Sequence, residues 1–474
     1  MPRHSRQCRQ DTIKVMDRWS KTYGDIYGMY NGDVPFLMVK DLELLRQVFV
    51  TDFAVFMDRG DVWATMNGNS ELRNTLPFAK SDRWKFLRRA VSIAFTASKM
   101  RRMTDGMSKA VDHFLDLLEA RCRKSVRGEV NVYPMLGTLA FEMVAETACG
   151  LHLSVQDKPD DQYFDSANSY LLNVIESAYQ RTGQFFSGTK VLMWLTCQLE
   201  RHFGREPHTC LTRKAQPIIT LREKEPHLAR PDVLQSLLDA KIPKELLSRP
   251  EFRVRANSEG HFLMPLKDVS SNAAAVLTAG LETVAVACAN CVFCLAKHPE
   301  VQVKVRQEVN AAHDKHGGFT YDAIKDMHYT RQVINETLRL YSPVIAFATR
   351  KASCDFRCKD ISLPKGINIM ACTQQIHRDP CYWDKPEEFN PDRFSSQEKA
   401  NRHPLAFQPF GMGARNCVGS RLALLEVTLI VARLVHRYLL HLGSRHANGE
   451  LERKTQSIVA SPGEGVWIRV KKIL

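Results

Sequence analysis

Most of the chain alternates hydrophobic and polar positions at the three- and four-residue spacing of an amphipathic helix. The pattern is strongest from about residue 82 to about residue 341. Turn-rich stretches interrupt it near 152–162, 204–208 and 249–262. The apolar run from about Leu266 to Lys297 predicts the longest helix, which would span roughly 45 Å. The sequence therefore predicts a mainly α-helical fold with one long central helix.

Short strand-like segments flank this helical region. Residues 26–40 alternate around Asn31-Gly32, a strong signal for a β-hairpin. After Pro343 the chain changes to short strands and turns, as at 361–369, and residues 465–470 predict a last strand. Further helices are expected at about 10–24, 41–50 and 418–438. We therefore expect a minor β-sheet assembled from both ends of the chain.

Length and composition favour one globular body. The 474 residues are 44% hydrophobic and 25% charged, without a repeat or a low-complexity tract, so we expect a single domain spanning 1–474. Basic residues exceed acidic ones, and the net charge of +14 is spread along the chain. That balance favours an acidic partner protein or a membrane surface over nucleic acid, for which no motif is present.

Neither disulfides nor a membrane anchor is expected. The 13 cysteines are odd in number and irregularly spaced, which favours free thiols and a reducing compartment. No apolar run follows the basic N-terminus, so we expect no signal peptide. The apolar stretch 276–296 carries Glu282 and Asn290, and because a charge deep in a bilayer is costly, we expect a buried helix there.

The most informative segment is Phe410-Gly411-Met412-Gly413-Ala414-Arg415-Asn416-Cys417-Val418-Gly419. Its glycines allow turns and close approaches that a Cβ would obstruct. Cys417 lies where a loop becomes a helix, so exposed N–H groups and the helix dipole would favour the thiolate that metals bind. Arg415 can donate charge-assisted hydrogen bonds to an anion. A lone cysteine here would be an ordinary thiol, but the surrounding pattern favours a metal ligand.

This segment resembles the haem-binding loop of the cytochrome P450 family, Phe-x-x-Gly-x-Arg-x-Cys-x-Gly. The resemblance implies that Cys417 is the axial ligand of a haem iron. It also implies that Phe410, Gly411 and Gly419 belong to the cofactor-binding loop.

A helix motif and a later segment match the same family. Glu336 and Arg339 match its Glu-x-x-Arg helix, in which positions i and i+3 share a face. Arg393, in Pro391-Asp392-Arg393-Phe394, matches the arginine that completes a buried triad. Alone, the first two would be a surface pair. The resemblance implies a structural role for all three, that of holding the loop that presents Cys417.

Midway along the longest helix, Ala279-Gly280-Leu281-Glu282-Thr283 resembles the family's oxygen-activation segment. The resemblance implies that Glu282 and Thr283 are catalytic and relay protons to bound dioxygen. It also implies that Ala279 contacts the haem and that Gly280 thins the helix where it passes the macrocycle. Alone, Thr283 would be an ordinary helix threonine bonded to a carbonyl.

One tryptophan and several arginines occupy positions that pair with haem propionates in the family. Trp84 and Arg88 match a Trp-x-x-x-Arg helix, whose i and i+4 positions can reach one propionate. Arg350 and Arg415 occupy two further positions, and Arg59 is a weaker candidate. Each alone would be an ordinary solvated arginine, but together they imply haem b as the cofactor.

The resemblance covers nearly the whole chain and is closest to the microsomal group with the vertebrate 3A drug-metabolising enzymes and thromboxane synthase. It implies the cytochrome P450 fold and a monooxygenase that inserts one oxygen atom of dioxygen into a lipophilic steroid, fatty acid or xenobiotic. Electrons would come from NADPH through NADPH–cytochrome P450 reductase, with cytochrome b5 as a further partner. The implied location is the cytosolic face of the endoplasmic reticulum membrane, although the N-terminal anchor and Pro-rich hinge of microsomal members are absent from this chain.

Two sets of residues are expected to meet the partner and the substrate. A basic docking surface would comprise Arg83, Lys85, Arg88, Arg89, Arg421, Arg433 and Arg437. The substrate pocket would draw on 60–78, 165–200, Thr278, Ala279 and 344–347, with Phe185, Phe186 and Trp194 as a candidate apolar roof. Isolated aromatic residues are more often part of a core.

Three other functions remain as alternatives. A haem-thiolate isomerase of the thromboxane-synthase type would not need the acid–threonine pair, so Glu282 and Thr283 favour the monooxygenase. Cys288, Cys291 and Cys294 have the spacing of an iron–sulfur ligand run, but they lie in an apolar helix, whereas such clusters bind in loops. A catalytically silent haem or lipid carrier is disfavoured by the complete oxygen-activation segment.

Overall fold

The computed structural model describes most of the chain between Thr12 and Ile473. The residues outside the description in this range are 32–33, 61–69, 159, 177–190, 192–193, 196–197, 200–201, 204–206, 251, 253, 258–259, 346, 359 and 457. The proposed roof residues Phe185 and Phe186 therefore lie outside the described residues. Trp194 is described and is half exposed.

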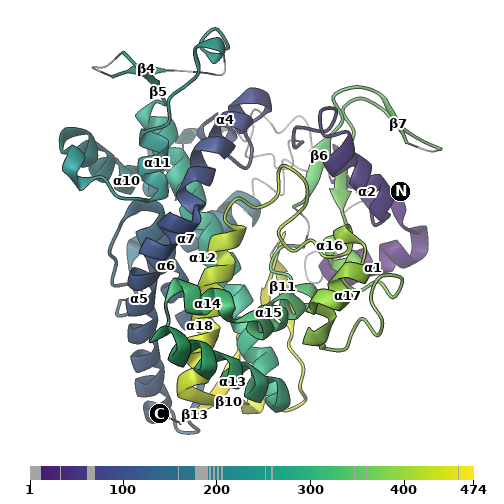
Figure 1. Cartoon of the computed structure of the whole chain (residues 1–474). Coiled ribbons are helices and arrows are strands. Elements are labelled where there is room, and N and C mark those ends of the chain that lie inside the picture. Colours follow the sequence, from purple (N-terminus) through teal and green to yellow (C-terminus); the bar gives the residue numbers. More distant parts are fainter. Residues whose placement is uncertain are drawn as a thin grey trace.

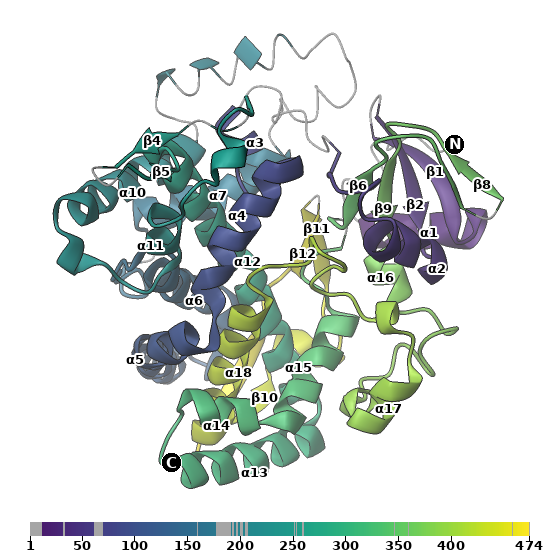
Figure 2. The same ribbon diagram turned by 45° about the horizontal axis from the view of Figure 1, so that its top comes forward.

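Helices make up most of the described chain, as the sequence predicts. They are α1 (Thr12–Tyr23), α2 (Leu42–Arg46), α3 (Ser70–Arg73), α4 (Ser81–Ser92), α5 (Ala97–Lys124), α6 (Val132–Cys149), α7 (Gln162–Glu176), α10 (Pro207–Lys224), α11 (Val233–Leu238), α12 (Leu266–Lys297), α13 (Pro299–His316), α14 (Tyr321–Asp326), α15 (His328–Leu340), α16 (Thr373–Ile376), α17 (Ser396–Asn401) and α18 (Ser420–Arg437). Figures 1 and 2 show most of them gathered on one side of the molecule, while α1, α2 and α16 accompany a small sheet on the other.

The strands form several small sheets, one of which combines strands from residues 26–39 with strands from residues 349–371 as expected, whereas the last predicted strand lies in another sheet. They are β1 (Ile26–Asn31), β2 (Val34–Val39), β3 (Glu129–Asn131), β4 (Arg255–Ala256), β5 (Phe262–Leu263), β6 (Thr349–Lys351), β7 (Phe356–Cys358), β8 (Ile361–Leu363), β9 (Asn368–Ala371), β10 (Tyr438–Leu442), β11 (Arg453–Gln456), β12 (Val459–Pro462) and β13 (Trp467–Lys472). The predicted hairpin β1–β2 forms and continues into the order β1-β2-β9-β6, with β2 and β9 parallel. The C-terminal strand β13 pairs with β10 and β3 instead, because those strands lie beside it.

Helix α12 runs through the core, where it packs against α6, α10, α18 and α15. Since helices surround it, it can be apolar on every side. Within the described part of the chain, it is the one helix long and apolar enough to cross a membrane, yet 78% of that apolar window is buried inside the protein. This matches the expected buried helix.

Helix α18 follows the Cys417 loop into the same core. The stripe Leu422, Leu425, Leu429, Ala432 and Val435 is buried, as its spacing predicts. The helix ends at Arg437, one residue before the predicted end, and the chain continues from Tyr438 as β10. Helix α18 thus anchors the segment that carries Cys417 to both α12 and a sheet.

Candidate active site

The segment before α18 forms a tight loop that presents Cys417. The Cys417 N–H donates a hydrogen bond of 2.8 Å to the carbonyl of Phe410, which closes the loop. Gly411 and Gly413 adopt left-handed backbone conformations, with φ of 71° and 67°. A Cβ at Gly413 would overlap the carbonyl oxygen of Phe49, so glycine is required there. The structure therefore explains two glycines of the motif from the protein's own packing.

Gly419 does not follow this explanation. Its φ is −88°, and a Cβ added there would meet no protein atom within 4 Å. Neither a left-handed turn nor a contact with the protein's own atoms demands glycine at this position, and a close approach to the cofactor stays a prediction. The Gly419 N–H instead donates a hydrogen bond to the Cys417 sulfur.

The Cys417 side chain is accessible although protein atoms surround it. Burial raises the pKa of its thiol, while the hydrogen bond from Gly419 and the positive charges of Arg88 and Arg59 lower it. Each of these lowering contributions favours the thiolate, the form that binds a metal. The thiol therefore lies among groups that would stabilise an anionic sulfur.

An arginine cluster, comprising Arg59, Arg88, Arg350 and Arg415, lies beside this loop. Desolvation lowers the pKa of Arg59 to about 9 and that of Arg415 to about 10. Desolvation also lowers the pKa of Arg350 well below its usual value, and repulsion among the arginines adds to the shifts of Arg59 and Arg350. Among the described residues, the only carboxylate ion-paired with the cluster is Asp58, 3.2 Å from Arg415.

The cluster also has buried donors without partners in the described structure. These are Nε of Arg59, Nε of Arg350, and Nε and Nη1 of Arg415. A buried donor without an acceptor is costly, and so is a buried charge without a counter-charge. The cluster therefore requires further negative charge, which Asp58 alone does not supply.

Helix α4 brings Trp84 and Arg88 to the same place. The Trp84 ring lies under the guanidinium of Arg415, 4.4 Å away, and supports it by a cation–π contact. Arg88 donates hydrogen bonds to Asn416, the residue next to Cys417. The acceptors are the carbonyl oxygen and the side-chain oxygen of Asn416. The sequence-predicted residues of α4 thus meet the arginine cluster and the Cys417 loop.

One face of α12 opens in the middle of this otherwise buried helix. Val276, Gly280 and Thr283 are half-buried and Ala279 is exposed, a spacing of i, i+3, i+4 and i+7 that forms a single stripe. The Thr283 hydroxyl donates to the Ala279 carbonyl at 2.7 Å. Thr278 is buried instead, with its hydroxyl on the Ala274 carbonyl, so its expected place in the pocket is wrong.

Gly280 is explained by helix packing. A Cβ there would approach Val144 of α6 to 2.6 Å. The close contact between α12 and α6 therefore requires glycine, and the expectation that Gly280 also thins the helix beside a macrocycle stays a prediction.

Glu282 turns from Thr283 toward α6. Its carboxylate accepts a hydrogen bond from the Tyr133 hydroxyl at the start of that helix. Burial raises the pKa of Glu282, and the bond from Tyr133 opposes that shift. The predicted acid–threonine pair is thus adjacent in sequence, but each member is bonded to a different neighbour.

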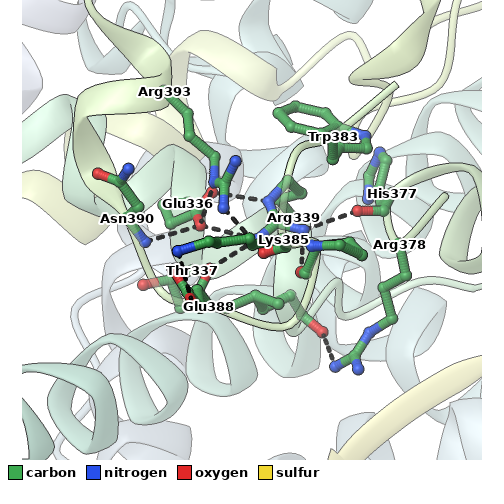
Figure 3. Close-up of polar contacts among 12 residues, drawn as sticks. Glu336, Thr337, Arg339, His377, Arg378, Trp383, Lys385, Glu388, Asn390 and Arg393 are labelled. Carbon is green, nitrogen blue, oxygen red and sulfur yellow. Dashed lines mark hydrogen bonds and ion pairs between the residues drawn. The ribbon is translucent and has the colours of Figure 1, made fainter. Parts of the chain in front are cut away.

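Glu336, Arg339 and Arg393 meet as the sequence predicts, in a buried network shown in Figure 3. Arg339 Nε and Nη2 each lie 2.7 Å from a Glu336 oxygen, and both side chains are fully buried. Arg393 Nε lies 3.4 Å from Glu336. The remaining Arg339 donors bond the carbonyls of His377, Pro386 and Glu388. Arg339 therefore gathers two separate backbone segments, at His377 and at residues 386–388, around one guanidinium.

The predicted basic docking surface is only partly formed. Arg83 is buried and ion-paired with Asp268 at 3.0 Å, so it cannot meet a partner. Arg433 and Arg437 are bound to carboxylates of α5, and Lys85 pairs with Asp82. Arg89 and Arg421 are exposed.

Cys288, Cys291 and Cys294 are buried within continuous helix α12, where burial raises each thiol pKa. In the described part of the chain, no group of three or more His, Cys, Asp or Glu side chains is arranged to hold a metal ion. These cysteines therefore pack the helix, as the sequence favours.

Sequence reasoning missed Asp58, Tyr133 and His377. The His377 segment, His377-Arg378-Asp379-Pro380, resembles the family, but no local pattern shows what its ring contacts. Asp58 and Tyr133 carry no signal of their own, because their partners lie on distant segments.

Comparison with known proteins decides the family, since the model for cytochrome P450 matches residues 4–468. The chain belongs to the cytochrome P450 family. Cytochrome P450 3A29 of Sus scrofa is 28% identical, over 88% of this chain and 79% of that protein. Cytochrome P450 6B2 of Helicoverpa armigera is 28% identical over 94% and 85%, and lithocholate 6-beta-hydroxylase of Mesocricetus auratus is 28% identical over 90% and 81%.

Membership confirms the predicted fold class, the resemblance to the 3A enzymes and the cofactor. This cytochrome P450 is an oxidoreductase of the monooxygenase class and binds haem b. The roles of the individual site residues stay predictions.

Proposed function

We propose that this cytochrome P450 inserts one atom of dioxygen into a lipophilic small molecule, with electrons from NADPH delivered by a separate reductase. The observation that carries the proposal is the accessible Cys417 thiol beside an arginine cluster short of negative charge. Haem b offers an iron to the sulfur and two carboxylates to the arginines. The residues present therefore fit this cofactor.

Cys417 would hold the iron as a thiolate, favoured by the Gly419 N–H and by Arg88 and Arg59. Arg350 and Arg415, with unpartnered buried donors, would bind the propionates together with Trp84 and Arg88. Phe410, Gly411, Gly419 and Ala279 would line the cofactor site. Glu336, Arg339 and Arg393 would hold the Cys417 loop without touching the cofactor.

Haem b, when bound, supplies the activation of dioxygen and the transfer of one oxygen atom. The protein's task is to deliver protons and exclude bulk water. Thr283 lies on the open stripe of α12 and can donate its hydroxyl proton toward that stripe by leaving the Ala279 carbonyl. Burial raises the pKa of Glu282, which favours its protonated form, and the hydrogen bond from Tyr133 gives its carboxylate a partner for proton exchange.

The substrate would be a steroid, a fatty acid or a xenobiotic. The open stripe of α12 offers apolar groups, namely Val276, Ala279 and the Thr283 methyl, which suit a lipophilic molecule. The relative named lithocholate 6-beta-hydroxylase acts on a steroid by its name, which supports this class. Phe347, half-buried against Arg59 and Phe78, would border the site.

The chain would act as one domain at the cytosolic face of the endoplasmic reticulum membrane, in peripheral contact with it. NADPH–cytochrome P450 reductase, with cytochrome b5 as a further donor, would dock where Arg89 and Arg421 are exposed. Exchanging both for Glu should weaken electron transfer and leave the haem spectrum unchanged. Equal electron-transfer rates would contradict this docking site.

A haem-thiolate isomerase is the second candidate. The observation that favours it is that Glu282 and Thr283 are both bonded within the protein and do not converge. Product formed from a lipid peroxide without NADPH would support the isomerase. Product that requires NADPH, reductase and dioxygen would support the monooxygenase.

The decisive experiment is the absorption spectrum of the reduced protein with carbon monoxide. We expect a thiolate-type band that is lost in Cys417→Ala. Cys354→Ala, which removes an exposed cysteine, serves as the control and should keep the band. Retention of the band in Cys417→Ala would show that another residue ligates the iron.

A further inference from the structure

His377 lies between the buried ion-pair network and the Cys417 loop. Its carbonyl accepts a hydrogen bond of 2.8 Å from Arg339 (Figure 3). Its side chain is fully buried. Its ring stacks on Phe407, with centroids 5.5 Å apart and planes inclined by 29°. Arg339 thus fixes the backbone of His377, and Phe407 fixes its ring.

The ring of His377 accepts the N–H of Gln408 through Nε2 at 2.9 Å. A backbone N–H can only donate, so Nε2 must carry a lone pair and the proton lies on Nδ1. Burial, followed by the charge of Arg339, lowers the pKa of His377 to about 3. The geometry and the low pKa therefore agree that the ring is a neutral acceptor at neutral pH.

Gln408 starts the segment that ends at Cys417. The Gln408 carbonyl accepts the Gly411 N–H at 3.0 Å, and the Phe410 carbonyl accepts the Cys417 N–H at 2.8 Å. Hydrogen bonds joined by short stretches of chain therefore link the Glu336–Arg339 pair, through the backbone and ring of His377, to the backbone of Cys417.

We propose that His377 is a positioning residue for the thiolate ligand. Its ring fixes where the loop leaves Gln408, and this sets the direction in which Cys417 presents its sulfur. The inference rests on the proposed role of Cys417 as iron ligand. It goes beyond that role, because it assigns the orientation of the sulfur to a residue that touches neither sulfur nor cofactor.

A residue that only supported the fold would have the same burial, so a matched histidine is needed for comparison. His446 is buried, and its Nε2 likewise accepts a backbone N–H, that of Trp467, at 3.1 Å. It lies beside β13, with its Nδ1 on the Glu450 carbonyl. Loss of its acceptor would remove the same type of hydrogen bond from another part of the fold.

The test compares His377→Phe, His377→Gln and His446→Phe in the holoenzyme. Phe keeps a ring for stacking and removes the acceptor, whereas Gln places an amide oxygen near the Nε2 position. We measure the ratio of thiolate-type to thiol-type carbon monoxide bands, the haem retained on dilution, and the thermal unfolding midpoint.

We expect the band ratio to fall on the order of tenfold in His377→Phe, because the Gln408 N–H loses a buried hydrogen bond. His377→Gln should keep most of the band ratio of the unchanged protein, because its amide oxygen can accept the Gln408 N–H. His446→Phe should lower the unfolding midpoint similarly and leave the ratio unchanged. Equal ratios in the two Phe variants, or a ratio that follows the unfolding midpoint alone, would overturn the proposal.

Two further variants complete the test. If His377→Phe gives no holoenzyme, His377→Asn, whose shorter side chain withdraws the acceptor, takes its place under the same criteria. Cys417→Ala separates the two proposals, since a thiolate band in that variant refutes the ligand itself. A normal ratio in His377→Phe with the band lost in Cys417→Ala refutes only the role of His377.

Discussion

The two sides of the active site are held in different ways. On the Cys417 side, backbone segments converge on a fully buried ion pair, and left-handed glycines fix the loop. On the α12 side, Thr283 bonds its own helix, and Glu282 is held by the single hydroxyl of Tyr133. The sulfur side is therefore fixed by many mutually dependent contacts, and the α12 side by a few separable ones.

This difference suits the two tasks. A ligand must hold one geometry throughout the reaction, and a buried network over-determines that geometry. A proton donor must exchange partners, and a single hydrogen bond can be broken and remade at low cost. We therefore expect changes on the Cys417 side to affect folding and ligation together, and changes on the α12 side to alter proton transfer alone.

The largest effect is expected from Glu336→Gln. Breaking a fully buried ion pair leaves an uncompensated charge, which costs about 3–5 kcal/mol, and Arg339 and Arg393 both lose their carboxylate. Chemical denaturation of the holoenzyme and the haem content after purification measure the result. Glu43→Gln, which removes a pair between half-exposed side chains, should change neither. A similar small effect in both variants would contradict the comparison.

Gly413→Ala should have the next largest effect. The added Cβ meets the Phe49 backbone at a positive φ, and both strain and overlap oppose it, at a cost on the order of 1–3 kcal/mol. Unfolding by denaturant gives the free energy. Gly137→Ala in α6 is the control, because its Cβ would meet only Phe164 at an ordinary 3.8 Å. If the two alanines cost the same, the Cys417 loop is less constrained than its contacts indicate.

Much of the fold and of the sulfur side could be predicted from sequence because the decisive residues are close together there. The helix period gave α12 and α18, and the Cys417 segment carries its glycines, arginine and cysteine within ten positions. Glu336 and Arg339 are one helical turn apart, so their pairing follows from local geometry. Arg393 needed the family resemblance, since nothing local places it beside Glu336.

The rest depends on distant partners. The side-chain bond between Tyr133 and Glu282 joins residues far apart in the chain, and no periodicity relates α6 to the middle of α12. The need for Gly280 arises from Val144 on the same α6, and the burial of Arg83 follows from Asp268. The sheet that contains β13 was not predicted for the same reason, because strand alternation predicts a strand and not its neighbour.

Tyr133→Phe should have the smallest effect on stability and a selective effect on protonation. The Tyr133 hydroxyl stabilises the ionised form of Glu282, so its loss, worth about 1 kcal/mol, should raise the pKa of that carboxyl beyond the increase already caused by burial. Because its pKa is raised, Glu282 in the folded protein keeps its proton to a higher pH than an exposed glutamate does. The Tyr133→Phe variant should release this proton at a higher pH than the unchanged protein. The infrared carbonyl band of protonated Glu282, identified by its absence in Glu282→Gln, can be titrated in both proteins.

Tyr438→Phe is the control. It removes another hydroxyl that lies beside a carboxylate, that of Glu119, and it should leave the titration of Glu282 unchanged. A titration shifted to lower pH, or a loss of the thiolate band in Tyr133→Phe, would mean that the two sides of the site are not separable.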